Sequence, residues 1–145
     1  MNRLTSRGFS LVELAVTLVV LGLVLAFGIP AFQSFNTTQQ LTGATENVAA
    51  QMRMMREVSI ATGTTQTMHF FAGTLGGDYH IHNAVVGGVW RLPRNITYYW
   101  GAGTNSVMVS TSDGRMTSSG WIILQDPQGN RDTVSVMASG LVLTQ

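Results

Sequence analysis

The chain has 145 residues, no cysteine and a formal net charge of +1, and its mean hydropathy is positive. Charged residues make up 10% of the chain, against about 25% in an average soluble domain. This composition excludes a disordered chain, and the lack of cysteine excludes a disulfide framework, a thiol nucleophile and a cysteine-based metal site. A net charge of +1 argues against a protein that holds nucleic acid by bulk electrostatics.

The first feature in chain order is a long apolar segment at residues 9–29. Its polar side chains are only Ser10, Glu13 and Thr17. As an α-helix the segment would span about 30 Å, the thickness of a bilayer core. Because Arg3 and Arg7 precede it, the positive-inside rule predicts a single-pass topology with a cytoplasmic N-terminus and an exported remainder. A cleaved secretory signal is the alternative, although its apolar region usually has only about 7–15 residues.

Glu13 is the unusual residue of this segment, because an ionised carboxylate inside a membrane helix costs at least about 2.5–3.5 kcal/mol. The cost falls when the carboxylate is protonated or paired with a cation. Arg7 lies six residues earlier, at the expected membrane surface, and no basic residue follows Glu13 within one helical turn. On charge alone two interpretations stay open: Glu13 lies near the headgroups without a role, or its partner belongs to another molecule.

The residues around Glu13 carry a specific motif. A short basic leader ends in Gly8, Phe9 follows, and the glutamate is the fifth residue after the glycine, ahead of an apolar run. This pattern resembles the processing site of type IV prepilins and type II secretion pseudopilins. Pro30 also falls where that family places a helix-kinking proline, at position 30 − 8 = 22 of the processed chain.

The resemblance assigns a role to each residue of the motif. It implies that a membrane aspartyl prepilin peptidase cuts after Gly8 and then N-methylates Phe9. It also implies that Glu13 forms an assembly charge pair with the terminal amine of a neighbouring subunit. Such a pair fits the physics, because two charges that are costly alone in lipid neutralise each other when subunits stack.

After Pro30 the sequence predicts that the helix continues as an amphipathic segment. From about residue 39 to residue 60, apolar side chains recur at offsets of 7, 4 and 3, which is a helical stripe. The stripe consists of Leu41, Val48, Met52 and Met55, broadened by Ala44 and Val58. We expect a β-sheet to dock on this stripe. Capping side chains at 36–38 allow a break or kink of the helix there.

Beyond this helix the sequence changes to short runs of β-branched and aromatic residues separated by glycine. The candidate strands are 65–71, 79–86, 89–92, 96–100, 106–110, 121–125, 133–137 and 141–143. Turn sequences at 113–114 and 127–130, with the close spacing of the runs, favour antiparallel pairing. The expected fold class is α+β and type IV pilin-like: a long N-terminal helix, partly transmembrane, packed on an antiparallel β-sheet domain.

Four segments follow from these patterns and from the resemblance. We expect a prepilin leader peptide at 1–8, a transmembrane and assembly helix at 9–29, an amphipathic continuation of the helix at 30–62, and a β-rich periplasmic domain at 63–145.

The C-terminal part carries a second resemblance. Its residues 112–115 (Ser-Asp-Gly-Arg), the strand at 122–124, Asp126, Gly129, Arg131 and residues 139–140 (Ser-Gly) resemble the GspH/FimT group of minor pseudopilins and minor type IV pilins. The resemblance implies a structural, non-catalytic subunit of a short periplasmic filament, anchored in the bacterial inner membrane. Its implied partners are other pilins or pseudopilins, the prepilin peptidase and an inner-membrane assembly platform.

A DNA-binding minor pilin for DNA uptake is the alternative function. Arg91 and Arg94, close in sequence to the aromatic residues 98–100, offer a small candidate patch for DNA. However, FimT-like members linked to DNA uptake commonly have basic residues after the final glycine, and none follows Gly140 here. Removing the leader with its two arginines and no acid also changes the net charge from +1 to −1, which argues against DNA binding.

The three histidines are the remaining candidate ligands. His80 and His82 are two residues apart and would share a strand face, and His69 is a candidate third member. Imidazoles so arranged can bind zinc or copper. No further ligand is identifiable and exposed strand histidines are common, so the sequence predicts no metal site and no cofactor. It also lacks a nucleophile elbow and a phosphate-binding glycine loop, and we expect no enzymatic activity.

Overall fold

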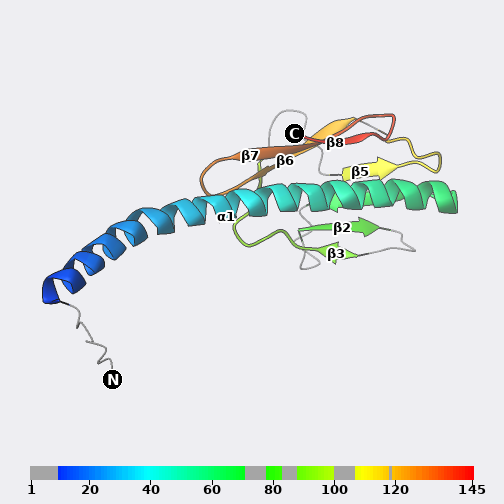
Figure 1. The fold of residues 1–145 in the computed structure, drawn as a ribbon. Coiled ribbons are helices and arrows are strands. Elements are labelled where there is room, and N and C mark those ends of the chain that lie inside the picture. Colours follow the sequence, from blue (N-terminus) through cyan, green and yellow to red (C-terminus); the bar gives the residue numbers. More distant parts are fainter. Residues whose placement is uncertain (1–9, 71–77, 83–87, 100–106, 118) are drawn as a thin grey trace, which may run out of the picture. The chain divides into compact units, whose positions relative to one another are not determined.

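The computed structural model describes residues 10–70, 78–82, 88–99, 107–117 and 119–145. The chain divides into two compact units, Met1–Asn36 and Thr37–Gln145. A single helix, α1 (Leu11–Thr62), extends through the boundary between them, and all the described strands belong to the second unit (Figure 1).

In the first unit, the described residues consist of Ser10 and the first part of α1. Ser10 begins the helix: its Oγ accepts a hydrogen bond from the Val12 N–H (3.2 Å) and its carbonyl accepts one from the Leu14 N–H (3.1 Å). This is the role of an N-cap residue, which satisfies donors that have no partner inside the helix. Helix α1 is long and apolar enough, by length and composition, to cross a membrane.

The helix does not break at residues 36–38, where capping side chains allowed a break. These residues remain helical. Capping side chains compete with the helix for backbone hydrogen bonds, but in the middle of a long helix each added residue gains a hydrogen bond without a new nucleation cost. The capping chemistry that matters for α1 is that of Ser10, at its start.

The second unit contains two four-stranded antiparallel sheets. The first sheet has the order β3-β2-β1-β5 and the second has the order β4-β6-β7-β8. The first sheet consists of β1 (Gln66–Phe70), β2 (Tyr79–His82), β3 (Val89–Trp90) and β5 (Val107–Ser110). The second consists of β4 (Thr97–Tyr99), β6 (Gly120–Gln125), β7 (Arg131–Val136) and β8 (Val142–Thr144).

Each predicted run overlaps one of these strands, which confirms the α+β fold class, although β6 and β7 begin before the predicted runs and β8 ends after its run. The ends predicted at 71, 83–86, 100 and 106 lie outside the described residues. Strand β3 is shorter than expected, because the Leu92 N–H donates to Asp78 Oδ2 (2.7 Å) instead of continuing a ladder. The hairpin predicted at 127–130 connects β6 to β7, and Asp126 closes it by accepting a hydrogen bond from the Asn130 N–H (2.8 Å).

The strands form two sheets, a partition that the sequence did not predict. After β5 the chain turns at residues 111–115 and reaches Met116, which forms an isolated bridge with Ser110. Met116 then donates its N–H to Ala138 O (3.1 Å), next to the second sheet. The bridge therefore extends the pairing of β5, and no continuous ladder among the described residues joins the two sheets. Runs of strand-forming residues alone do not predict this partition.

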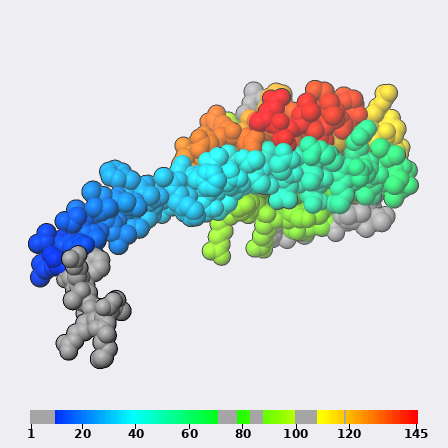
Figure 2. Space-filling view, in the orientation of Figure 1, coloured from blue at the N-terminus to red at the C-terminus, as the bar shows by residue number. Residues whose placement is uncertain are grey.

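The core of the second unit lies between α1 and both sheets. The predicted stripe is buried, with Val48 and Met52 at 0% exposure, although Val58 is only half-buried. The first sheet contributes Met68 and Met108 to this core, among others, and the second contributes five aliphatic side chains: Ile122, Leu124, Val134, Val136 and Val142. Figure 2 shows β7 and β8, in orange to red, along the second part of α1, which is residues 37–62. The Arg53 guanidinium donates to Val142 O there (3.3 Å).

Candidate assembly segment and histidine cluster

The processing residues Gly8 and Phe9 lie outside the described residues, and Glu13 lies in the first turn of α1. Ser10 and Glu13 form the Ser-x-x-Glu pattern typical of a helix N-terminus. This pattern is a local signal from which the start of the helix can be predicted. A carboxylate in the first turn is also stabilised by the positive end of the helix dipole, by about 0.3–1 kcal/mol. The helix therefore offsets part of the cost of the Glu13 charge.

Glu13 has no ion pair within the described part of the chain. The described ion pairs are Glu46–Arg53 (3.8 Å) and Asp113–Arg115 (3.6 Å). Glu13 is also the single charged residue between positions 10 and 36, and the next basic residue along the chain is Arg53. The described residues thus provide no cation that compensates this carboxylate.

The side chains around Glu13 in sequence form an uncovered apolar surface. Every residue from 10 to 36 is exposed, including fifteen large hydrophobic side chains between Leu11 and Phe35. Each of these fifteen is at least 49% exposed, and Leu11 reaches 84%. They do not form a single stripe, because apolar residues occupy all sides of the helix. A helix that is apolar all round is typical of a membrane span or of a helix covered by other subunits.

Pro30 lies inside α1. Because proline has no backbone N–H, the carbonyl of Ala26 lacks the partner that an α-helix normally gives it. The kink expected from the family resemblance stays a prediction.

The candidate DNA-contact residues Arg91 and Arg94 are exposed between β3 and β4. The neighbouring aromatic side chains have other contacts. Tyr98 packs against the core and its Oη donates to Asp78 O (3.2 Å), and burial raises the pKa of Tyr98. The centroid of the Tyr99 ring lies 3.5 Å from the guanidinium carbon of Arg131, a partner that proximity in sequence does not indicate. Binding of DNA by Arg91 and Arg94 stays a prediction.

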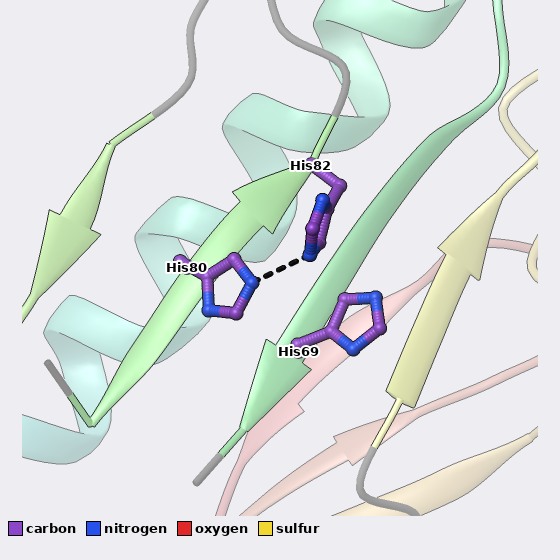
Figure 3. Close-up of side chains that lie close together, drawn as sticks. All are labelled: His69, His80 and His82. Atoms are coloured by element: carbon purple, nitrogen blue, oxygen red, sulfur yellow. Dashed lines mark hydrogen bonds between the residues drawn. The ribbon is translucent and has the colours of Figure 1, made fainter. Parts of the chain in front are cut away.

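The three histidines come together on the first sheet (Figure 3). His69 on β1 is paired directly with His80 on β2, and their rings are stacked with centroids 5.2 Å apart. His82 follows on the same face of β2, and its Nε2 lies 2.7 Å from His80 Nε2. One ring nitrogen from each histidine lies within 4.8 Å of the other two. The sequence predicted the shared face of His80 and His82, and the β1–β2 register adds His69.

The histidines differ in burial. His80 is buried at 7% exposure, His69 is half-buried and His82 is exposed. Burial lowers the pKa of His80 below 6.5, with a further contribution from His82. Burial also lowers the pKa of His69, followed by the effects of His82 and His80. A lowered pKa means that the folded chain favours the neutral imidazoles, which keep a free lone pair.

Comparison with known proteins gives two findings. Residues 3–29 match the model of the prokaryotic N-terminal methylation motif. The structure resembles a crystal structure of the type IV minor pilin FimU from Pseudomonas aeruginosa strain PAO1, with a TM-score of 0.59. The match has 11% sequence identity and covers 77% of this chain and 92% of that chain. Among curated proteins, none matches the chain significantly.

These findings agree on the class of protein. The motif match covers the N-terminal segment, and the structural likeness, at 11% identity, shows the fold. The chain has a prepilin N-terminus and a type IV pilin-like fold, and together they support its placement in the type IV pilin-like superfamily.

Proposed function

We propose that the protein is a minor pilin or minor pseudopilin of the GspH/FimT kind, which assembles into a short periplasmic filament of a type IV pilus or a type II secretion system. The observation that carries the proposal is the first part of α1. It exposes apolar side chains on all sides and carries Glu13 as its single charge between positions 10 and 36. A lipid bilayer before assembly and neighbouring helices after assembly would cover this surface.

In this proposal the chain is made as an inner-membrane precursor with a cytoplasmic N-terminus. Prepilin peptidase removes residues 1–8 after Gly8 and methylates Phe9. Residues 9–29 form the transmembrane and assembly helix, residues 30–62 continue it, and residues 63–145 form the periplasmic domain. The type IV pilin-like fold and the methylation motif support this organisation. The partners are other pilins or pseudopilins and an inner-membrane assembly platform.

The proposed chemistry of assembly is the pairing of two charges. Before assembly, the Glu13 carboxylate has no cation among the described residues, and cleavage would create an amine at Phe9. Neither charge is stable alone in the apolar phase, whereas a pair between neighbouring subunits neutralises both. The pair would also set the axial position of one subunit relative to the next.

The processing part is tested by the mass of the protein isolated from native membranes. We expect a chain that begins at Phe9 and carries one added methyl group. Gly8→Asp should leave the precursor uncut, because the peptidase would no longer find its glycine. A chain that begins at Met1, or that is cut near Pro30, would refute the proposed processing site.

The assembly part is tested with Glu13→Ala in the same membranes. We expect normal cleavage, but recovery in sheared filaments should fall by roughly tenfold or more relative to the unaltered protein. The reason is that removal of one partner of a buried ion pair costs about 3–5 kcal/mol. Glu46→Gln is the matched control: it removes an exposed carboxylate of the same helix, and its ion pair with Arg53 is on the surface. Equal recovery of Glu13→Ala and Glu46→Gln would disprove the charge-pair role.

A further inference from the structure

The histidine cluster, defined as His69, His80 and His82, contains all the histidines of the chain. It lies on the face of the first sheet that points away from the core. On β1 the core side chains are Gln66, Met68 and Phe70, so His69 alternates to the other face. Its partner across the ladder, His80, and the next residue on that face, His82, share this side. Three imidazoles thus converge from two adjacent strands.

The hydrogen bonding of the cluster is incomplete. The contact between His80 Nε2 and His82 Nε2 (2.7 Å) requires one of these nitrogens to carry a proton. The other nitrogen of the most buried ring, His80 Nδ1, is buried and has no hydrogen-bond partner among the described residues. A buried polar atom without a partner is costly, so such groups in native proteins call for a specific explanation.

We infer that the histidine cluster is a binding site for a divalent transition-metal ion, with Zn²⁺ as the ion that its chemistry fits. Zinc–imidazole bonds are about 2.0–2.1 Å long, so tetrahedral ligands lie about 3.3 Å from one another. The ring nitrogens of the cluster lie within 4.8 Å of one another, and the closest pair is at 2.7 Å. Side-chain rotations that widen the closest pair and shorten the longest separation would bring all three to coordinating distance.

The surroundings restrict the kind of ion. Imidazole nitrogen suits zinc, copper and nickel, whereas magnesium and calcium require oxygen ligands. The nearest acidic residue in sequence, Asp78, is already engaged: its Oδ2 accepts the Leu92 N–H at 2.7 Å. Three protein ligands leave one tetrahedral position for water or for a donor from another molecule. His82 is the exposed member, so this position would open toward solvent.

The bound ion would link β1 to β2, because His69 belongs to one strand and the other two ligands belong to the next. A ligand that binds only the folded state raises its stability by mass action. The site would therefore act as a structural clip on the first sheet. It does not depend on the proposed filament function, and its test is separate from those of Gly8 and Glu13.

The test uses the full chain in detergent micelles, purified without a polyhistidine tag and stripped with EDTA. Calorimetric titration with ZnCl₂ should show one saturable site per chain, and MgCl₂ should give no binding. At about 100 times the Kd, Zn²⁺ should raise the Tm by roughly 5–10 °C. His82→Ala should weaken binding by roughly 100-fold or more, since loss of even an outer-shell partner costs about 10–100-fold.

Val89→Ala is the matched control. Val89 is half exposed and lies on β3, where it pairs with His80 on the neighbouring strand β2. It provides no metal ligand, so this variant should bind Zn²⁺ normally. His82 is exposed, and we expect His82→Ala to fold; its Tm without metal checks this. His69→Ala removes a second proposed ligand, the one on β1, and should also weaken Zn²⁺ binding. Absence of saturable Zn²⁺ binding, or equal binding by His82→Ala and the unaltered chain, would overturn the inference.

Discussion

The two parts of α1, residues 11–36 and 37–62, belong to one helix but differ in which of their side chains are buried. In the first part every residue is exposed and apolar side chains occupy all sides. In the second part six of the eight buried residues form a stripe with offsets alternating between 4 and 3, and the other two are Ala44 and Ala49. This stripe is Leu41, Thr45, Val48, Met52, Met55 and Ser59. The second part therefore finds its packing partners within its own unit, whereas the side chains of the first part stay exposed among the described residues.

The difference shows that hydrophobicity alone does not predict what a helix packs against. The second part contains two buried polar residues, Thr45 and Ser59, and the hydroxyl group of each has a hydrogen-bond partner. Thr45 Oγ1 donates to Leu41 O (3.0 Å), and the Ser59 and Ser110 hydroxyls lie 2.6 Å apart. The first part is more apolar but has no comparable contacts to other elements among the described residues. Periodicity, more than mean hydropathy, separates a helix that packs on its own domain from one that packs elsewhere.

The largest expected effect comes from truncating the centre of the stripe. Met52→Ala should lower the free energy of unfolding of the second unit by about 2–5 kcal/mol, because Met52 is fully buried and its loss leaves a cavity. Val19→Ala is the matched change in the first part, where Val19 is 64% exposed, and it should leave this free energy unchanged. Urea unfolding of the full chain in detergent, followed by tryptophan fluorescence, measures both. Equal effects would show that the two parts of α1 are not energetically distinct.

A smaller effect is expected at the turn that packs on the second part of α1. Gly140 has φ +83°, and a Cβ there would lie 2.2 Å from Gly114 O and 2.6 Å from Arg56 Nε. Gly140→Ala should therefore cost about 2–3 kcal/mol in the same unfolding experiment, from backbone strain and from displacement of these atoms.

The control for Gly140 is Gly129→Ala. Gly129 also has positive φ (+88°), but its Cβ would meet only Gln125 Nε2, at 3.6 Å. This variant should show the strain alone, about 1–2 kcal/mol. A cost at Gly140 no larger than at Gly129 would mean that the contact with the Arg56 region does not constrain the turn.

Much of this architecture could be predicted from local sequence. The apolar stripe correctly predicted a helix, and the runs of β-branched residues correctly predicted strands. Both patterns arise from side chains that face one core. Thr45 and Ser59 were missed because the stripe was read from apolar residues alone. Completing the 4-3 repeat from Leu41 would have included both.

The features that could not be predicted from the sequence depend on contacts between residues that are distant along the chain. Ser59 and Ser110 are 51 residues apart, and nothing local indicates that their hydroxyls meet. The division into two sheets depends on which strands pair with one another, and the histidine cluster depends on the register that places His69 opposite His80. In each case the sequence contained the residues but not their pairing, because strand pattern specifies a face and not a partner.

The smallest expected effect compares glycines within α1 itself. Gly43 and Gly22 are exposed helix residues, and a Cβ at either would meet nothing within 4 Å. In a helix interior alanine is favoured over glycine by about 0.5–1 kcal/mol. Gly43→Ala should therefore raise the free energy of unfolding of the second unit by up to this amount, since Gly43 lies between the buried residues Leu41 and Ala44.

Gly22→Ala should leave that free energy unchanged, because residue 22 belongs to the part of α1 without packing partners in the described chain. If Gly22→Ala stabilised the second unit as much as Gly43→Ala, helix formation in the two parts would be coupled, and the contrast between them would concern surface chemistry only. If only Gly43→Ala does so, the contrast extends to folding. The first part of α1 would then be a helix whose energetics are set by lipid or by neighbouring subunits, as its proposed role in assembly requires.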